Sequence, residues 1–183
     1  MSESLSGKLL VATPELTDPN FARSVVLLVE HAGSEGAFGV VLDQPTEIPV
    51  AAYLEEWAGY AADPAVVFRG GPVSPEVAIG LADTPGTPKP EWKAVTGGVG
   101  LVDLGLDPGD LGGVLRCRAY SGYAGWAPGQ LEEEIGTGSW FIVDATPEDV
   151  YATNPDTLWR DVLRRQPDIR SWYSLYPDHP LLN

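Results

Sequence analysis

Short apolar runs, separated by glycine, proline and polar residues, recur along the whole chain. Apolar or alternating runs of about four to eight residues between turn residues are typical of β-strands. The pattern predicts roughly seven or eight strands. The segments are 8–12, 24–30, 37–42, 65–68, 76–81, 92–95, 114–120 and 140–143, with weaker signals at 76–81 and 92–95. The turn at 33–36 joins the second and third segments, so residues 24–42 are expected to form a β-hairpin.

Four other segments carry helix signals. Apolar residues recur at helical spacing across 49–61, with Thr46 as a candidate cap and proline in the first turn. A short helix is expected at 128–135, a capped helical turn at 146–149 and a longer helix from Asn154. Because strands and helices alternate, the fold class is predicted as α/β or α+β, in one domain over residues 1–183. The hairpin indicates that the sheet is mixed.

The length and cysteine content exclude several classes of protein. A chain of 183 residues suits one domain. Its longest aliphatic run, residues 25–29, is far shorter than a membrane span, and no signal peptide is visible. The single cysteine excludes an internal disulfide and a cysteine-based zinc cage. We therefore expect a cytoplasmic protein that makes no membrane contact.

The charge makes nucleic acid an unsuitable direct partner. Eleven Lys and Arg residues face 26 Asp and Glu residues, which gives a net charge of −15. Binding to a phosphate backbone depends on neutralisation by Lys and Arg. The one basic cluster is interrupted by Asp161 and Asp168 and consists of Arg160, Arg164, Arg165 and Arg170. Any role in transcription would then act through a partner protein that contacts the DNA.

The common catalytic templates do not match this chain. Ser121 lacks the flanking glycines of a nucleophile elbow, and no phosphate-binding loop is present. The two histidines, His31 and His179, lie too far apart in sequence to form a metal-binding pair. Residues 114–120 alternate, so Arg118 and its even-numbered neighbours share one face and Cys117 points inward on the other. No cofactor and no metal site is predicted.

Polar residues at a strand entrance form the first candidate site. Asn20 and Arg23 precede the strand that ends at Glu30 and His31, and together they could orient an anionic ligand. Alternatively, this segment is a turn in which Arg23 pairs with a carboxylate. His31 is open to two interpretations, a hydrogen-bonded structural residue or an acid/base group.

Glycine-flanked aromatic residues form the second candidate site. The glycines beside Tyr123 and Trp126 favour a loop that presents both rings, followed by a helix N-terminus with Gln130 and Glu132. A ligand or partner would dock where Gly70 and Gly71 approach the two rings. The alternative is that the rings pack into the core.

Ordered motifs along nearly the whole chain carry a family resemblance. They are Gly7-Lys8-Leu9-Leu10, residues 18–26, Glu30-His31, residues 36–39, residues 70–73, residues 122–126, residues 128–132, Trp140 and Leu182-Asn183. On these motifs the chain resembles the YqgE/AlgH family of bacterial proteins. The resemblance implies a single domain with a mixed, bifurcated β-sheet, partly closed like a barrel and surrounded by helices.

The resemblance implies little about function. No reaction or cofactor is established for the family, and AlgH is named for a proposed regulatory role in alginate biosynthesis. The chain departs from the family pattern at Asp43, where members usually have Asn, and at Ala127, where Gly is common. Because Asp has no amide donor, a ligand contact made by that Asn does not transfer simply to Asp43.

Three hypotheses follow. The first is a non-enzymatic module that binds a protein or small-molecule ligand through the aromatic segment. The second is an enzyme on a small anionic metabolite, with His31 or Glu132 as acid/base and Arg23 as anion clamp. The third is indirect transcriptional regulation. The sequence predicts no oligomeric state, although six tryptophans suggest that some lie at an interface.

Overall fold

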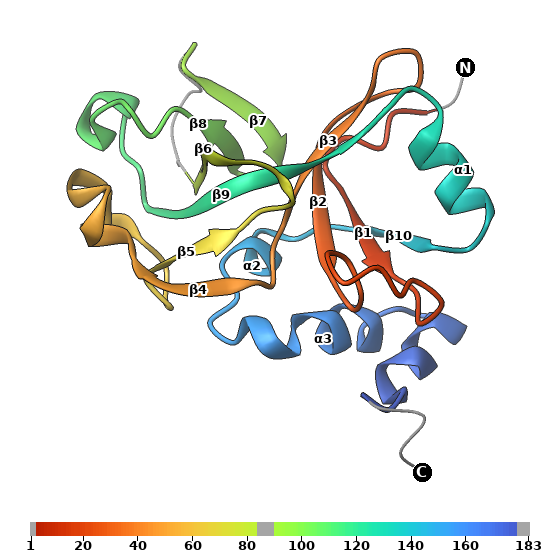
Figure 1. The fold of residues 1–183 in the computed structure, drawn as a ribbon. Helices are drawn as coiled ribbons and strands as arrows, with labels where there is room; N and C mark the ends of the chain where they lie inside the picture. The colour runs from red at the N-terminus through yellow and green to blue at the C-terminus, as the bar shows by residue number, and fades with distance from the viewer. Residues whose placement is uncertain (1–2, 84–89, 179–183) are drawn as a thin grey trace.

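The centre of the protein is one mixed sheet of ten strands (Figure 1). The structure is a computed structural model that describes residues 3–83 and 90–178, so His179 and the ending Leu182-Asn183 lie outside the described residues. The strands are β1 (Lys8–Ala12), β2 (Val25–Ala32), β3 (Gly36–Val41), β4 (Pro45–Pro49), β5 (Val66–Arg69), β6 (Val73–Asp83), β7 (Trp92–Thr96), β8 (Val99–Val102), β9 (Arg116–Trp126) and β10 (Trp140–Asp144).

Short helices cover this sheet. The α-helices are α1 (Gln130–Gly136), α2 (Pro147–Val150) and α3 (Leu158–Arg164). The 3₁₀ helices are η1 (Val50–Ala52), η2 (Glu55–Tyr60), η3 (Pro108–Leu111), η4 (Pro155–Thr157) and η5 (Ile169–Leu175). Helix α1 flanks β10 and β3, and α3 packs beside β1 and η5 (Figure 1). No helix among residues 3–83 and 90–178 has the length and apolarity that a bilayer crossing requires.

Strand β9 divides the sheet into two branches. Near its end, Gly125 pairs with Phe38 of β3, which leads to β2, β1 and β10. Its middle pairs in parallel with β5, where Phe68 is opposite Tyr120, while its other edge pairs antiparallel with β6. The branches curl around a common interior (Figure 1). The mixed, bifurcated, half-barrel sheet of an α+β fold is therefore confirmed.

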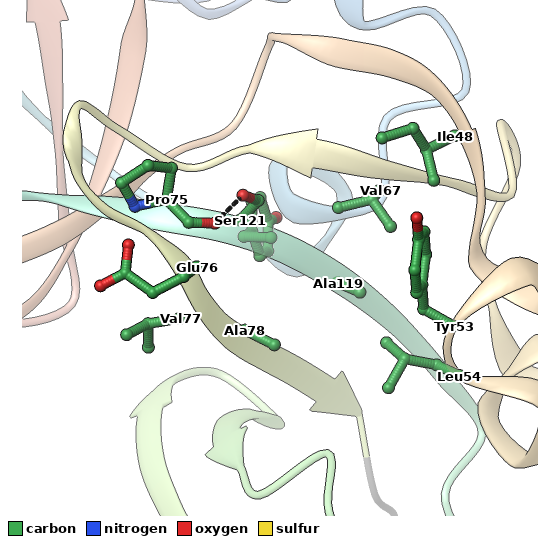
Figure 2. Close-up of a pocket in the computed structure, with 11 residues that line it drawn as sticks. Ile48, Tyr53, Leu54, Val67, Pro75, Glu76, Val77, Ala78, Ala119 and Ser121 are labelled. Carbon is green, nitrogen blue, oxygen red and sulfur yellow. Dashed lines mark hydrogen bonds between the residues drawn. The ribbon is translucent and has the colours of Figure 1, made fainter.

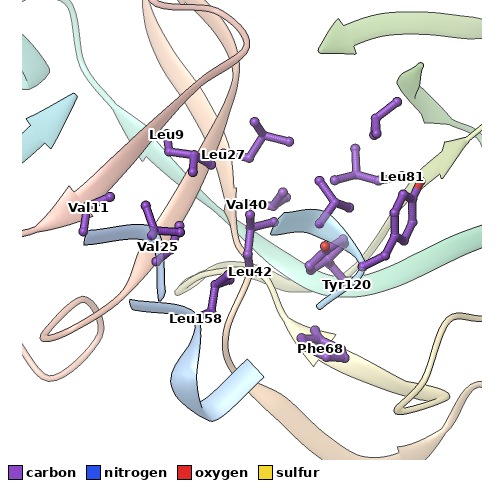
Figure 3. Packing of buried hydrophobic residues seen from close by; sticks show 14 of the residues in the cluster. Leu9, Val11, Val25, Leu27, Val40, Leu42, Phe68, Leu81, Tyr120 and Leu158 are labelled. Carbon is purple, nitrogen blue, oxygen red and sulfur yellow. The ribbon is translucent and has the colours of Figure 1, made fainter. Parts of the chain in front are cut away.

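Burial on both faces explains the continuous apolar runs. Leu9 and Leu27 face the largest core cluster (Figure 3). Trp159 of α3 belongs to the same cluster, whereas Leu10 and Val26 face a second cluster under α1. Because successive strand residues point to opposite faces, a strand covered on both sides must be apolar at every position. The sequence prediction of β1, β2 and β3 succeeded for this reason.

The predicted helix at 49–61 is two short 3₁₀ helices instead of one continuous helix. Residues 45–49 form β4 and the following residues form the two 3₁₀ helices η1 and η2. Pro49 has an extended backbone with ψ 141° and caps η1 from outside the helix. The buried ring of Trp57 then anchors η2, because its Nε1 donates to the carbonyl of Leu104 at 3.0 Å. This long-range contact outweighs the local helical spacing.

Candidate functional site

The expected aromatic loop is part of strand β9. Tyr123 and Trp126 lie three positions apart on this strand, so their side chains point to opposite faces. Tyr123 is half-buried, with its ring centroid 5.1 Å from that of Phe38. Trp126 is only 6% exposed and belongs to the second core cluster. The prediction of a shared, solvent-facing recognition surface was wrong, and the core-packing alternative is correct.

Glu134 organises the surroundings of Trp126. Its Oε2 atom accepts hydrogen bonds from Nε1 of Trp126 and Nε1 of Trp140, each at 2.9 Å. Its Oε1 accepts from Gln130 at 3.1 Å, and the Gln130 side chain also accepts from the backbone N–H of Ala127 at 3.0 Å. Gln130 therefore fixes the start of α1. One sequence signal for Glu134 was its position four residues after Gln130, on the same face of the helix.

Gly70 and Gly71 allow the backbone to cross β9 at close range. A Cβ atom on Gly70 would lie 2.4 Å from the carbonyl oxygen of Gly122, and one on Gly71 would lie 2.1 Å from the carbonyl carbon of Tyr123. Gly70 also donates its N–H to the carbonyl of Ser121 at 2.9 Å. The predicted approach to Tyr123 is correct for its backbone, and this contact leaves no space for a ligand between the glycines and β9.

Asn20 and Arg23 bind different parts of the chain. The guanidinium of Arg23 donates to Asp178 at 3.0 Å and lies 4.7 Å from the ring centroid of Trp159. It therefore holds the segment after η5, in agreement with the alternative in which it pairs with a carboxylate. Asn20 accepts from Nη2 of Arg69 at 2.7 Å. The structure gives no convergence of Asn20 and Arg23 on one ligand position.

His31 and Glu132 do come together. Nε2 of His31 lies 2.7 Å from Oε1 of Glu132, and Nδ1 of His31 accepts from the backbone N–H of Leu5 at 3.1 Å. The hydrogen bond from His31 is the largest cause that lowers the pKa of Glu132. Because the Nδ1 lone pair is used by Leu5 and the Nε2–H by Glu132, neither ring nitrogen is available to a substrate. The geometry fits the structural interpretation of His31.

Burial governs two further titratable side chains. The thiol of Cys117 is buried, which raises its pKa to about 12. It therefore packs as an apolar group, as predicted. The carboxyl of Asp43 accepts from the backbone N–H of Val25 at 3.3 Å, and desolvation raises its pKa to about 7. Among residues 3–83 and 90–178, no group of three His, Cys, Asp or Glu side chains is arranged to hold a metal ion.

An apolar pocket lies between β4, η1 and a bulge of β6 (Figure 2). It has a volume of about 440 Å³. Ala119 and Ser121 of β9 and Ala78 of β6 contribute small side chains to its lining. Ile48 and Tyr53 stand on one side of these residues, opposite the bulge (Figure 2). This apolar pocket combines segments that are distant in sequence.

The bulge forms the opposite wall of the apolar pocket. The pairing register between β6 and β9 shifts between Val73 and Ala78. Pro75 lies within this shift, and proline cannot donate to a sheet ladder. The hydroxyl of Ser121 donates to the Pro75 carbonyl and ties the bulge to β9 (Figure 2). Glu76 is the charged residue among those that line the pocket.

Sequence reasoning missed this pocket. Tyr53 is 79% exposed and Val77 is 42% exposed, which is unusual for large apolar side chains on facing walls. The available signal was Pro75, directly before the weak strand predicted at 76–81, because proline in a sheet is confined to edges, strand starts and bulges. None of the residues singled out for chemistry in the sequence analysis lines the pocket apart from Ser121.

Comparison with known proteins establishes the family. The AlgH-like family profile matches residues 9–169. The chain belongs to this family. A UPF0301 protein of Streptomyces coelicolor is 50% identical over 98% of this chain and 96% of its own length. A second UPF0301 protein, of Thermobifida fusca, is 42% identical over 98% of this chain and 96% of its own length.

Solved structures of AlgH-like proteins share the fold. The crystal structure of protein DIP2367 from Corynebacterium diphtheriae has a TM-score of 0.88 and 34% identity, over 94% of this chain and 93% of that one. The solution structure of AlgH from Pseudomonas aeruginosa has a TM-score of 0.62 and 28% identity, over 85% and 87%. None of these names states a ligand or a reaction, so a function for this AlgH-like protein depends on the geometry of its own site.

Proposed function

We propose that this AlgH-like protein is a non-enzymatic binding module and that the apolar pocket holds a small molecule with a flat apolar body. The observation that carries the proposal is an open pocket of about 440 Å³ with apolar walls. Ligand sites for small molecules commonly have volumes of roughly 300–1,000 Å³ and a few polar groups among apolar ones. The pocket has this size and this composition.

The small side chains suit a ring system. Ala78 and Ala119 leave the surface between β6 and β9 shallow enough for a planar group. Tyr53 stands beside this surface with most of its side chain in solvent, where it can stack on a bound ring. Binding would cover Ile48, Tyr53 and Val77, all of which are exposed in the free protein.

Charge restricts the ligand further. Glu76 stands at the bulge, and the protein as a whole carries a net charge of −15. Both repel an anion. We therefore expect a neutral or cationic ligand, in contrast to the anionic metabolite of the enzyme hypothesis.

Binding is favoured over catalysis because the acid/base candidates are committed elsewhere. His31 and Glu132 bond to each other away from the residues that line the apolar pocket. Arg23, the proposed anion clamp, holds Asp178. We propose a cytoplasmic location for this module. Any effect on transcription would follow through a partner protein.

Three compounds that share one ring system but differ in net charge test the proposal. Indole, tryptamine and indole-3-acetate share the same apolar body and are neutral, cationic and anionic. In NMR titrations, indole and tryptamine are expected to shift the amide signals of residues 53, 78 and 119, with indole-3-acetate binding at least about tenfold more weakly because of repulsion.

The variant Ala78→Phe should fill the apolar pocket and weaken the binding of indole by at least about tenfold, because the added ring occupies the volume that the ligand would take. Leu115→Phe is the matched control, because Leu115 is 62% exposed and lies outside the pocket. Binding by Ala78→Phe that equals binding by Leu115→Phe would contradict the proposal.

A further inference from the structure

Arg118 is a buried cation that forms no ion pair with the acidic residues among those the structure describes. Arg118 is only 2% exposed. The guanidinium donates to the carbonyls of Asp63, at 2.8 Å, and Ala152, at 3.3 Å. Among the described residues it forms no ion pair, and its Nε–H has no hydrogen-bond acceptor. A buried charge is costly unless an opposite charge balances it.

Two buried hydroxyls that interact electrostatically with Arg118 also lack hydrogen-bond partners. They belong to Tyr120, which is fully buried on β9, and Tyr151, which is 3% exposed after α2. Burial raises the pKa of both hydroxyls. Each therefore keeps its proton and can donate it to an acceptor. Buried polar groups without partners are uncommon, and three in one cluster require an explanation.

The three side chains lie in one region of the core. Arg118 and Tyr120 share a face of β9, as the alternation predicted. The Arg118 guanidinium lies 4.3 Å from the ring centroid of Phe68, whose ring is 6.0 Å from that of Tyr120. Figure 3 shows Tyr120 and Phe68 within the largest cluster. The bond from Arg118 to Ala152 reaches the residue directly after Tyr151.

We propose that Arg118, Tyr120 and Tyr151 bind a small monovalent anion of about the size of chloride inside the core. Such an anion accepts hydrogen bonds from Nε–H and from both hydroxyls, and its charge balances the guanidinium. A water molecule can accept at most two of these three bonds and carries no net charge. The near-complete burial of all three residues restricts the ion to a small one.

The proposal is independent of the ligand of the apolar pocket. Arg118 and Tyr151 lie outside the residues that line the pocket, and Tyr120, which does contribute to the lining, faces the proposed ion with its buried hydroxyl. A negative net charge of the whole protein does not exclude the site, because the buried guanidinium is the nearest charge to the ion.

Thermal unfolding in different anions tests the proposal. The protein is prepared in sodium gluconate, whose anion is too large to enter, and gluconate is replaced by chloride or bromide at constant ionic strength. Because unfolding releases a bound ion, chloride is expected to raise the melting temperature in a saturating manner. Crystals grown in bromide are expected to show an anomalous scattering peak between Arg118 and the two hydroxyls.

Hydroxyl-deletion variants separate this site from general salt effects. Tyr120→Phe and Tyr151→Phe should each weaken the apparent chloride affinity at least about tenfold, because each removes one donor. Tyr176→Phe removes a hydroxyl from a residue that is 39% exposed and is the matched control, with an unchanged chloride response. A wild-type melting temperature that is equal in gluconate and chloride overturns the proposal. So does a chloride response that persists in both buried variants, or a bromide crystal with only water at the cluster.

Discussion

Several residues in this protein have roles that depend on burial more than on residue type. Trp126 and Trp140 share a single carboxylate oxygen of Glu134, so two indoles are held by one acceptor. His31 is fixed between Leu5 and Glu132. Both His31 and Glu134 are capable of acid/base chemistry. Here they position the chain instead, because the hydrogen-bonding atoms named above already have partners.

Asp43 gives a prediction at the residue scale. Its pKa is 3.8 for a solvated carboxyl and about 7 in the folded protein, so the folded state binds more protons than the unfolded state between these values. The resulting stabilisation is present below about pH 4 and is lost as the pH rises through about 7. Asp43→Asn keeps an oxygen acceptor for Val25 but does not ionise. We expect Asp43→Asn to be more stable than wild type at pH 8, by roughly 1–3 kcal/mol, with a smaller gain at pH 5.

Chemical denaturation of both proteins from pH 5 to pH 8 measures this difference. Glu47→Gln removes an exposed carboxylate and is the control, with a difference from wild type that stays nearly constant. Parallel stability profiles for wild type and Asp43→Asn would show that the folded environment does not resist ionisation of Asp43.

At the scale of elements, β9 is the strand on which the fold depends. It pairs with β3, β5 and β6, and the chain from β5 to β6 crosses it at Gly70 and Gly71. Neighbouring backbones approach so closely at this crossing that a methyl group has no space. The branching of the sheet therefore requires glycine at these positions.

A single methyl group at the crossing should destabilise the whole domain. Gly71 has φ +154°, and a Cβ there would overlap the backbone of Tyr123. We expect Gly71→Ala to lower the free energy of unfolding by roughly 3 kcal/mol or more, since rigid backbone must move. Gly59→Ala is the control, because a Cβ there meets no atom within 4 Å. Urea denaturation that finds the two variants equally stable would refute the role of the crossing.

At the scale of the whole molecule, charge sets the choice of partner. The net charge of −15 is expected to prevent direct binding to duplex DNA at physiological salt. An electrophoretic mobility shift assay with the purified protein should show no retardation at about 0.15 M salt. Retardation that weakens steeply with added salt would mean that a basic surface acts despite the net charge.

The sequence predicted those strands and helices whose signals lie within one short window of the chain. Strand β2 and helix α3 were predicted because apolar periodicity and capping residues lie within one short window. The end of β9 was missed, since Gly122 and Gly125 resemble loop residues unless pairing with β3 is known. Among the tryptophans, Trp172 is 71% exposed and thus the one that best fits the interface expected from the sequence.

The candidate pocket was harder to predict than the fold. Its lining comes from separate segments that include Ile48, Val67, Ala78 and Ala119, and none of these residue types indicates chemistry by itself. Arg118 was placed on the correct strand face by alternation, but its burial depends on Phe68 and the chain after α2. Long-range packing of this kind is not visible in a local window of sequence.

The alternation of residues 118–121 has a practical consequence for mutagenesis. Within these four positions Ala119, Tyr120 and Ser121 line the apolar pocket, and Arg118 and Tyr120 belong to the proposed ion cluster. Tyr120 belongs to both environments, so an effect of Tyr120→Phe is assigned to the ion cluster only where Tyr151→Phe shows the same effect. Substitutions outside β9 change one environment at a time: Ala78 belongs only to the apolar pocket, and Tyr151 belongs only to the ion cluster.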